Sequence, residues 1–143
     1  MAALSKDTRP RIVAIGGPTA TGKTALSVAL ARQFDGEIIS ADSMQIYKGL
    51  DVGTAKVTEE EKNGVPHHLV DFLAPDQIFS VADFVGLADG TIQEITARGR
   101  LPFVVGGTGL YMTSMLSGLN FAPEKTDPAL RDALNRRLAE EGP

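Results

Sequence analysis

The chain has 143 residues, of which 43% are apolar, and it carries a formal net charge of -4. This length and composition are typical of one globular domain with its own core and exclude a disordered segment. The absence of cysteine excludes disulfides, thiolate catalysis and cysteine-based zinc sites, and the acidic balance argues against an extensive nucleic-acid-binding surface, which would require clustered Lys and Arg.

The sequence contains no signal for a membrane or for export. No run approaches the ~20 apolar residues of a membrane span, and residues 1–10 lack the apolar region of a signal peptide. We therefore expect a cytoplasmic protein with no membrane partner, acting as a monomer. The last residues follow directly on a helical pattern, and we expect the chain to be a truncated fragment.

A strand, a glycine-rich loop and a helix are the first predicted elements. Residues 12–15 form a β-branched run suited to a buried strand. After residue 23, apolar side chains recur at helical spacing, which predicts a helix. This stripe consists of Ala25, Leu26, Ala29, Leu30 and Phe34.

The loop between this strand and this helix has the residue types and spacing of a phosphate-binding P-loop. Gly17 and Gly22 let the backbone turn and bring N–H groups against phosphate oxygens, at a helix N-terminus whose dipole favours an anion. Lys23 adds a positive charge, and the Thr24 hydroxyl suits a Mg²⁺ ligand. The predicted diphosphate- or nucleotide-binding residues are Gly17, Pro18, Thr19, Ala20, Thr21, Gly22, Lys23 and Thr24.

A second strand is predicted at residues 37–40, with Asp42 just beyond its C-terminal end. Ligands of open α/β sheets sit outside the carboxyl ends of the strands, so this carboxylate is predicted to face whatever the loop holds and to be catalytic. Two other interpretations stay open, in which Asp42 caps the next turn or holds Mg²⁺ through water.

The next segments are predicted to line a cleft and to carry short elements. Residues 44–49 and 53–56 have no strict period and are expected to line a cleft instead of building core. Residues 58–61 fit a capping box that opens a short helix with a solvated acidic face. A short strand is predicted within residues 66–72, where His67 and His68 would point to opposite faces and could not chelate one metal.

The second half of the chain predicts a parallel sheet. Residues 80–83 give a helix cap, and an apolar stripe at helical spacing then predicts a crossover helix that ends near Gly99. Residues 101–105 follow as a buried strand. The predicted fold is therefore α/β, a P-loop NTPase-like parallel sheet flanked by helices. The stripe consists of Val81, Phe84, Val85, Ala88, Ile92 and Ile95.

A second glycine-rich loop, residues 106–109, follows the last predicted strand. An ATPase would carry an acidic residue there, so energy-coupled hydrolysis becomes less favoured. With the Thr108 hydroxyl and free N–H groups the loop suits a second diphosphate contact, although an ordinary strand-to-helix turn is the alternative. Helices are predicted from Leu110 and from Asp127-Pro128, the last of them bearing Arg131, Arg136 and Arg137, which could simply be a solvated face.

Four segments together resemble the bacterial tRNA dimethylallyltransferases: residues 17–24, 39–56, 66–69 and 105–111. The resemblance covers the chain from Ile12 to about Arg131. It implies transfer of a dimethylallyl group from dimethylallyl diphosphate to N6 of the adenosine 3′ of the anticodon in tRNA, assisted by Mg²⁺. The partners it implies are this diphosphate, with ATP as a possible occupant of the same loop, and the tRNA anticodon stem-loop.

The resemblance also implies roles for single residues. The loop would hold the diphosphate leaving group, with Lys23 and Thr24 in catalysis and Thr24 on Mg²⁺, and Asp42 would be the general base toward the adenine amine. The implied tRNA contacts are Asp42, Ser43, Met44, Gln45, Thr108 and Arg131.

Such enzymes continue for as many residues again, with the rest of the sheet and a helical insertion that grips tRNA. Residues 1–143 would then be the N-terminal part of the catalytic domain, without that insertion and inactive in isolation. Three alternatives stay open at this point: a P-loop small-molecule kinase in which Asp42 orients an acceptor hydroxyl, an adenylate isopentenyltransferase, and a non-enzymatic nucleotide-binding module.

Overall fold

The computed structural model describes residues 9–118 and 127–142, and within them a parallel sheet of order β1-β4-β2-β3 forms the centre. Each of its strand pairings is parallel, which confirms the predicted parallel sheet. The predicted strands are all present, with small differences at their ends, but the first of them, predicted as buried, lies at the edge of the described sheet and has no buried residue. They are β1 (Val13–Gly16), β2 (Gly36–Ser40), β3 (His67–His68) and β4 (Leu101–Gly106).

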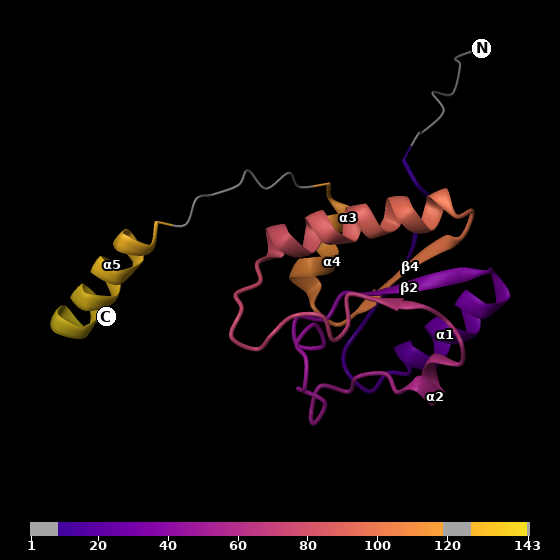
Figure 1. Ribbon diagram of the computed structural model, residues 1–143, viewed down its shortest axis with the longest axis horizontal. Helices are drawn as coiled ribbons and strands as arrows, with labels where there is room; N and C mark the ends of the chain where they lie inside the picture. Colours follow the sequence, from indigo (N-terminus) through magenta and orange to yellow (C-terminus); the bar gives the residue numbers. More distant parts are fainter. Residues whose placement is uncertain (1–8, 119–126, 143) are drawn as a thin grey trace, which may run out of the picture.

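Helices cover both faces of the sheet (Figure 1). On one face α1 packs over Ile38 and Phe103, and on the other α3 and α4 pack over Ile39 and Val104. Successive strand residues point to opposite faces, so each central strand contributes to both layers. The helices are α1 (Lys23–Gln33), α2 (Glu59–Lys62), α3 (Val81–Ala97), α4 (Gly109–Leu116) and α5 (Pro128–Glu141).

Of the apolar stripe predicted for α1, only Leu30 packs against the core, where it is partly buried. Leu26 and Phe34 are 52% and 56% exposed. The side chains that α1 buries are Ser27, Val28 and Ala31. Ser27 is tolerated there because its hydroxyl donates to the main-chain oxygen of Thr24 at 2.9 Å. A pattern search that scores serine as polar selects the wrong face of this helix.

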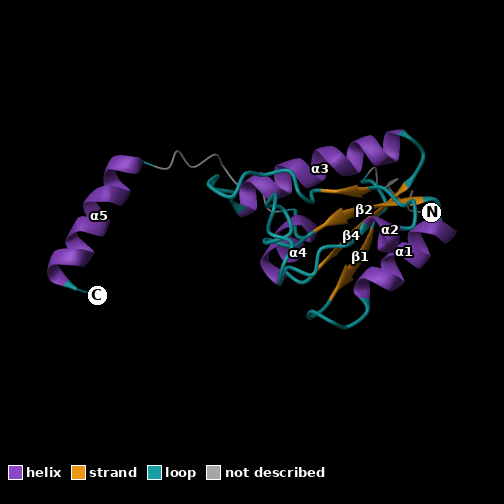
Figure 2. Ribbon diagram, turned by 60° about the horizontal axis from the view of Figure 1, so that its bottom comes forward, coloured by secondary structure: helices purple, strands orange, loops and turns teal. Residues whose placement is uncertain are grey.

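The other helices follow their sequence signals. Capping boxes open α2 at Thr58 and α3 at Ser80, as predicted, and Asp127 accepts hydrogen bonds from the first turn of α5. The predicted stripe of α3 is buried except for its first residue, Val81, which is partly buried. By contrast α5 buries no side chain, and it lies away from the sheet in both views (Figures 1 and 2).

The two histidines of β3 serve the fold. His67 Nδ1 lies 2.8 Å from the main-chain oxygen of Val65, and His68 Nε2 lies 2.6 Å from a carboxylate oxygen of Glu37. Residues 9–118 and 127–142 hold no group of three His, Cys, Asp or Glu side chains that could bind a metal ion. No helix in these same ranges is both long and apolar enough to cross a membrane.

Glu37, near the start of β2, is the carboxylate around which His68, Arg98 and Arg100 gather. Its side chain is 4% exposed and accepts hydrogen bonds from Arg98 at 2.8 Å and 3.2 Å and from Arg100 at 3.3 Å, besides its contact with His68. Burial by itself would raise the pKa of Glu37, but the hydrogen bonds and charges of Arg98 and His68 outweigh burial and lower it. The carboxylate therefore ties the start of β2 to the end of α3.

We expect Glu37→Gln to lower the free energy of unfolding at neutral pH by about 1.5–3 kcal/mol, the range for hydrogen bonds to a charged group, since the arginine heads stay partly in solvent. A carboxyl with a lowered pKa stabilises the fold above its unfolded value of 4.5, and this stabilisation is lost as the pH falls through the folded value. The difference between wild type and variant should thus shrink in acid. Urea unfolding of both proteins over a pH series measures it, with the exposed Glu60→Gln as control. An equal difference at every pH would contradict the assignment.

Candidate functional site

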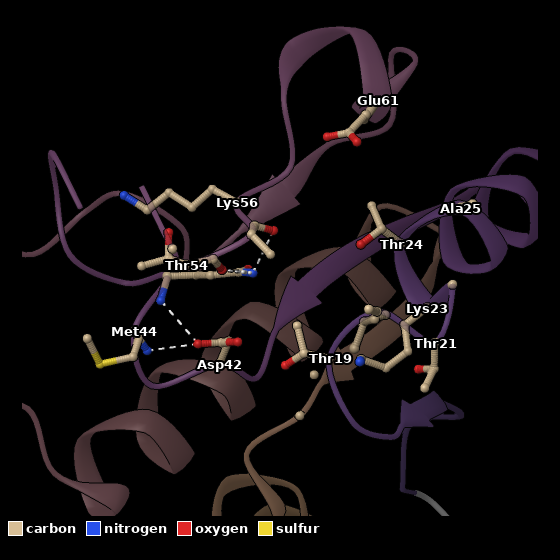
Figure 3. A pocket seen from close by; sticks show the side chains of 18 residues that line it. Thr19, Thr21, Lys23, Thr24, Ala25, Asp42, Met44, Thr54, Lys56 and Glu61 are labelled. Atoms are coloured by element: carbon tan, nitrogen blue, oxygen red, sulfur yellow. Dashed lines mark hydrogen bonds between the residues drawn. The ribbon is translucent and has the colours of Figure 1, made fainter. Parts of the chain in front are cut away.

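A cleft of about 690 Å³ opens at the carboxyl ends of β1, β2 and β4 (Figure 3). One wall is the glycine-rich loop with the first turn of α1, residues 19–25. The facing wall is formed by Asp42, Met44 and Gln45 of the turn after β2 and by residues 53–56. The end of β4, residues 105–107, closes the floor. The structure thus places most of the predicted site residues around one cleft.

The glycine-rich loop turns through left-handed backbone at Ala20 and Gly22, with φ of 64° and 84°. Gly22 is the N-cap of α1 and has no side chain to accept from the first turn, so the N–H groups there can bind an anion in the cleft. Lys23 Nζ and Thr21 Oγ1 both donate to the main-chain oxygen of Pro18. Gly17 and Pro18 themselves do not line the cleft, so the part of Pro18 in the loop is to anchor these two side chains.

Asp42 lies across the cleft from Thr19 and Lys23 (Figure 3). Its Oδ1 accepts hydrogen bonds from the main-chain N–H groups of Met44 at 2.8 Å and Gln45 at 3.2 Å. The capping interpretation is therefore correct for this oxygen. No group among residues 9–118 and 127–142 donates to the other oxygen, Oδ2, so capping leaves it available for chemistry.

The residues after Asp42 divide between cleft and core. Met44 is 49% exposed at the cleft, whereas Ile46 is 1% exposed and belongs to the core, so the prediction that residues 44–49 only line a cleft was wrong at Ile46. Gln45 donates through Nε2 to the main-chain oxygens of Thr54 at 3.0 Å and Ala55 at 3.1 Å. Its side chain is thus engaged in holding the facing wall together.

The second glycine-rich loop meets the Asp42 turn directly. Gly106 and Gly107 line the cleft. Thr108 does not line it, and its hydroxyl accepts a hydrogen bond from the main-chain N–H of Ser43 at 3.1 Å. The Thr108 hydroxyl was predicted as a diphosphate contact, but in the structure it joins the two loops. The residues of this loop that face the cleft are the glycines.

We expect Gly106→Ala to destabilise the chain by about 3 kcal/mol, at the upper end of the usual range for overpacking. An added Cβ would lie 2.3 Å from the main-chain oxygen of Ala41, and a backbone atom cannot move aside as a side chain does. Gly90→Ala is the matched control, because a Cβ in mid-α3 meets nothing within 4 Å and should stabilise the helix by about 0.5–1 kcal/mol. Urea unfolding measures both, and equal effects would refute the close approach.

Arg131 is not brought to the cleft. It lies on α5, exposed, on the helix that both views show away from the sheet (Figures 1 and 2). Its role as a tRNA contact stays a prediction, as do the roles of Ser43, Met44, Gln45 and Thr108.

The structure confirms that residues 53–56 line a cleft, but sequence reasoning did not single out two charged residues there, Lys56 and Glu61. Glu61 was interpreted only as part of a capping box, which it does form with Thr58. Lys56 pairs with Asp51 and Asp71. A loop lysine has no periodic signal, and nothing in the spacing of these residues predicts that they meet.

Comparison with known proteins identifies related sequences along the whole chain. A family model described as IPP transferase matches residues 45–143, and one described as isopentenyl transferase matches residues 10–71. A tRNA dimethylallyltransferase of Bacillus pumilus is 52% identical over 138 residues, covering 96% of this chain and 43% of the relative. One of Lactiplantibacillus plantarum is 53% identical over 137 residues, covering 94% and 44%.

Solved structures agree with these sequences. A full-length tRNA isopentenylpyrophosphate transferase from Bacillus halodurans superposes with a TM-score of 0.79 at 52% identity, covering 92% of this chain and 44% of that one. A eukaryotic dimethylallyltransferase acting on tRNA gives a TM-score of 0.71 at 30% identity, covering 94% and 37%. These matches confirm the predicted α/β fold. The chain spans less than half the length of each of these proteins.

Proposed function

The chain belongs to the IPP transferase family, and on that premise we propose that it forms the N-terminal part of an enzyme that transfers a dimethylallyl group from dimethylallyl diphosphate to N6 of the adenosine 3′ of the anticodon in tRNA. The names of the relatives support the proposal. The observation that carries it is the cleft in which an anion-binding loop faces the free oxygen of Asp42. "Full-length enzyme" below means the whole protein under this proposal.

The loop wall suits a diphosphate that becomes a leaving group. When the allylic carbon–oxygen bond breaks, the electron pair stays on the diphosphate oxygen and negative charge grows there. The N–H groups at the start of α1 are fixed before the reaction, and they stabilise that charge without having to reorganise. The Lys23 ammonium lies over the same loop, held by Pro18, and adds a full positive charge.

The residues present fit a Mg²⁺ ion shared with the donor. Mg²⁺ commonly takes one or two protein oxygens and completes its shell with substrate phosphates and water. Thr24 lines the cleft from the loop side and offers a hydroxyl as the protein ligand. When bound, the ion would neutralise charge on the departing diphosphate.

The Asp42 wall suits the acceptor. As the adenine N6 forms its bond to the allylic carbon, it must lose a proton, and Oδ2 of Asp42 can accept it while Oδ1 stays hydrogen-bonded to the turn. The adenine has to leave its stack to enter the cleft, at a cost of a few kcal/mol. A closed cleft would also keep water from the reactive allyl group.

The test asks which donor and which acceptor the full-length enzyme consumes. It is incubated with ATP or dimethylallyl diphosphate, each combined with AMP or unmodified tRNA. We expect pyrophosphate release only with dimethylallyl diphosphate and tRNA together. Consumption of ATP would favour a kinase using the same loop, prenylation of AMP would favour an adenylate prenyltransferase, and no consumption would leave a binding module.

A further inference from the structure

Lys56 is a charged side chain that the proposed reaction does not use. It is 7% exposed, and its ammonium donates to the main-chain oxygen of Tyr47 at 2.5 Å, to Asp51 Oδ1 at 2.9 Å and to Asp71 Oδ1 at 2.5 Å. A lysine ammonium has three hydrogens, so these three acceptors use all of them. Burial alone would lower the pKa of Lys56, but the hydrogen bonds and charges of Asp71 and Asp51 outweigh it and raise the pKa. Lys56 is therefore held as a cation, and it has no hydrogen left for a ligand.

The three acceptors lie at residues 47, 51 and 71, so Lys56 joins the turn after β2 to the segment that contains Asp71. The main-chain N–H of Asp71 donates to the oxygen of Gln45 at 3.0 Å, so the segment of Asp71 runs beside the turn after β2. Ala55 and Asp71 both have left-handed backbone, with φ of 50° and 58°. Such conformations are costly for residues other than glycine and persist where the surroundings hold them. Lys56 contributes to that hold beside the main-chain hydrogen bonds, because it follows Ala55 in the chain and bonds Asp71.

A short series of hydrogen bonds connects Lys56 to the carboxylate of the cleft. The main-chain oxygens of Thr54 and Ala55, next to Lys56 in the chain, accept from Gln45 Nε2. The main-chain N–H of Gln45 in turn donates to Asp42 Oδ1. Figure 3 shows Lys56, Thr54 and Asp42 on the same side of the cleft, opposite Thr19 and Lys23, with the Lys56 side chain pointing away from the glycine-rich loop. A shift of residues 54–56 would therefore move the turn that orients Asp42.

We propose that Lys56 is a positioning residue, which joins residues 47, 51 and 71 and so holds the Asp42 turn at its place opposite the glycine-rich loop. Its effect on the turn follows from these contacts alone, whereas its effect on the rate of transfer rests on the proposed function. The hydrogen bonds of the Lys56 ammonium go to Tyr47, Asp51 and Asp71 and not to the loop of residues 17–24, so donor binding should be unaffected.

The test combines hydrogen exchange with kinetics in the full-length enzyme. Lys56→Met keeps the length of the side chain and removes the ammonium. The control is Lys62→Met, which breaks the ion pair of Lys62 with the exposed Glu59. We expect the amides of Met44 and Gln45 to exchange about tenfold faster in Lys56→Met only. Single-turnover transfer should slow by about 10- to 100-fold, with the KM for the donor unchanged, because misplacement of a catalytic group acts on the chemical step.

The outcomes separate the two proposals. Unchanged exchange at Met44 and Gln45 overturns the positioning role, whatever happens to the rate. Faster amide exchange in Lys56→Met with a wild-type rate of transfer overturns the part of Lys56 in the reaction. A rise in the donor KM as the main effect overturns it as well. If the wild type transfers nothing, the proposed function has failed and the exchange result alone decides. If Lys56→Met does not fold, Asp71→Asn, half-exposed at 50%, removes one acceptor charge and should give the same changes in smaller size.

Discussion

Replacement of Asp42 by Asn in the full-length enzyme should slow dimethylallyl transfer by ~10² to 10⁴-fold, the usual contribution of a general base. The amide oxygen of Asn can still accept from the N–H groups of Met44 and Gln45, so the turn keeps its cap. The change falls on Oδ2, which becomes an NH₂ group that cannot accept a proton. Folding and tRNA affinity should therefore change little. Single-turnover transfer at saturating tRNA and donor measures the effect.

A magnesium series distinguishes the base from a metal-shell role. If Asp42 only holds Mg²⁺ through water, the deficit of Asp42→Asn should shrink as Mg²⁺ is raised, whereas more metal cannot replace a missing base. We expect the rate of the variant to stay low throughout the series. Recovery to near the wild-type rate at high Mg²⁺ would reject the base and leave Asp42 as a metal-shell residue.

Lys23→Ala should slow transfer by about 10² to 10³-fold, the usual effect of removing one group that stabilises developing charge. Lys23 is the first residue of α1 and belongs to neither hydrophobic cluster, so the fold should persist. Pyrophosphate should also inhibit the variant more weakly, because under the proposed function the same ammonium would contact the product.

Arg32→Ala is the control for charge, since it removes a cation from the last turn of the same helix, away from the cleft. It should leave both transfer and pyrophosphate inhibition unchanged. Wild-type kinetics in Lys23→Ala, with pyrophosphate inhibiting normally, would refute the role assigned to Lys23.

The parts of the fold that the sequence predicts are those with local signals. The strand, loop and helix around Gly22, the stripe of α3 and both capping boxes depend on residues close together in the chain, and the structure confirms them. The position of Asp42 could be predicted without knowing any of its contacts, because ligands of open α/β sheets bind at the carboxyl ends of the strands. The prediction of the buried face of α1 fails because Ser27, a polar residue, packs against the sheet while its hydroxyl donates to the main chain of its own helix.

The contacts that organise the cleft could not be predicted in this way. Thr108 meets Ser43 across 65 positions of sequence, and Arg98 meets Glu37 across 61. Lys56 reaches Asp71 between two loops. Such pairs depend on how the strands are ordered in the sheet, which no single segment specifies. For this reason some residues that were predicted to bind substrate, such as Gln45 and Thr108, have side chains that instead hold the walls of the cleft together.

The central claim is that the cleft stabilises a diphosphate as it leaves carbon, and the fate of the bridging oxygen tests this most directly. Dimethylallyl diphosphate carrying heavy oxygen between carbon and phosphorus is incubated with the full-length enzyme and unmodified tRNA, and the products are analysed by mass spectrometry. Carbon–oxygen cleavage predicts that all heavy oxygen leaves in pyrophosphate while tRNA gains a dimethylallyl adenosine. Heavy oxygen in dimethylallyl alcohol, or a phosphorylated acceptor, would mean phosphorus–oxygen cleavage and would contradict the account.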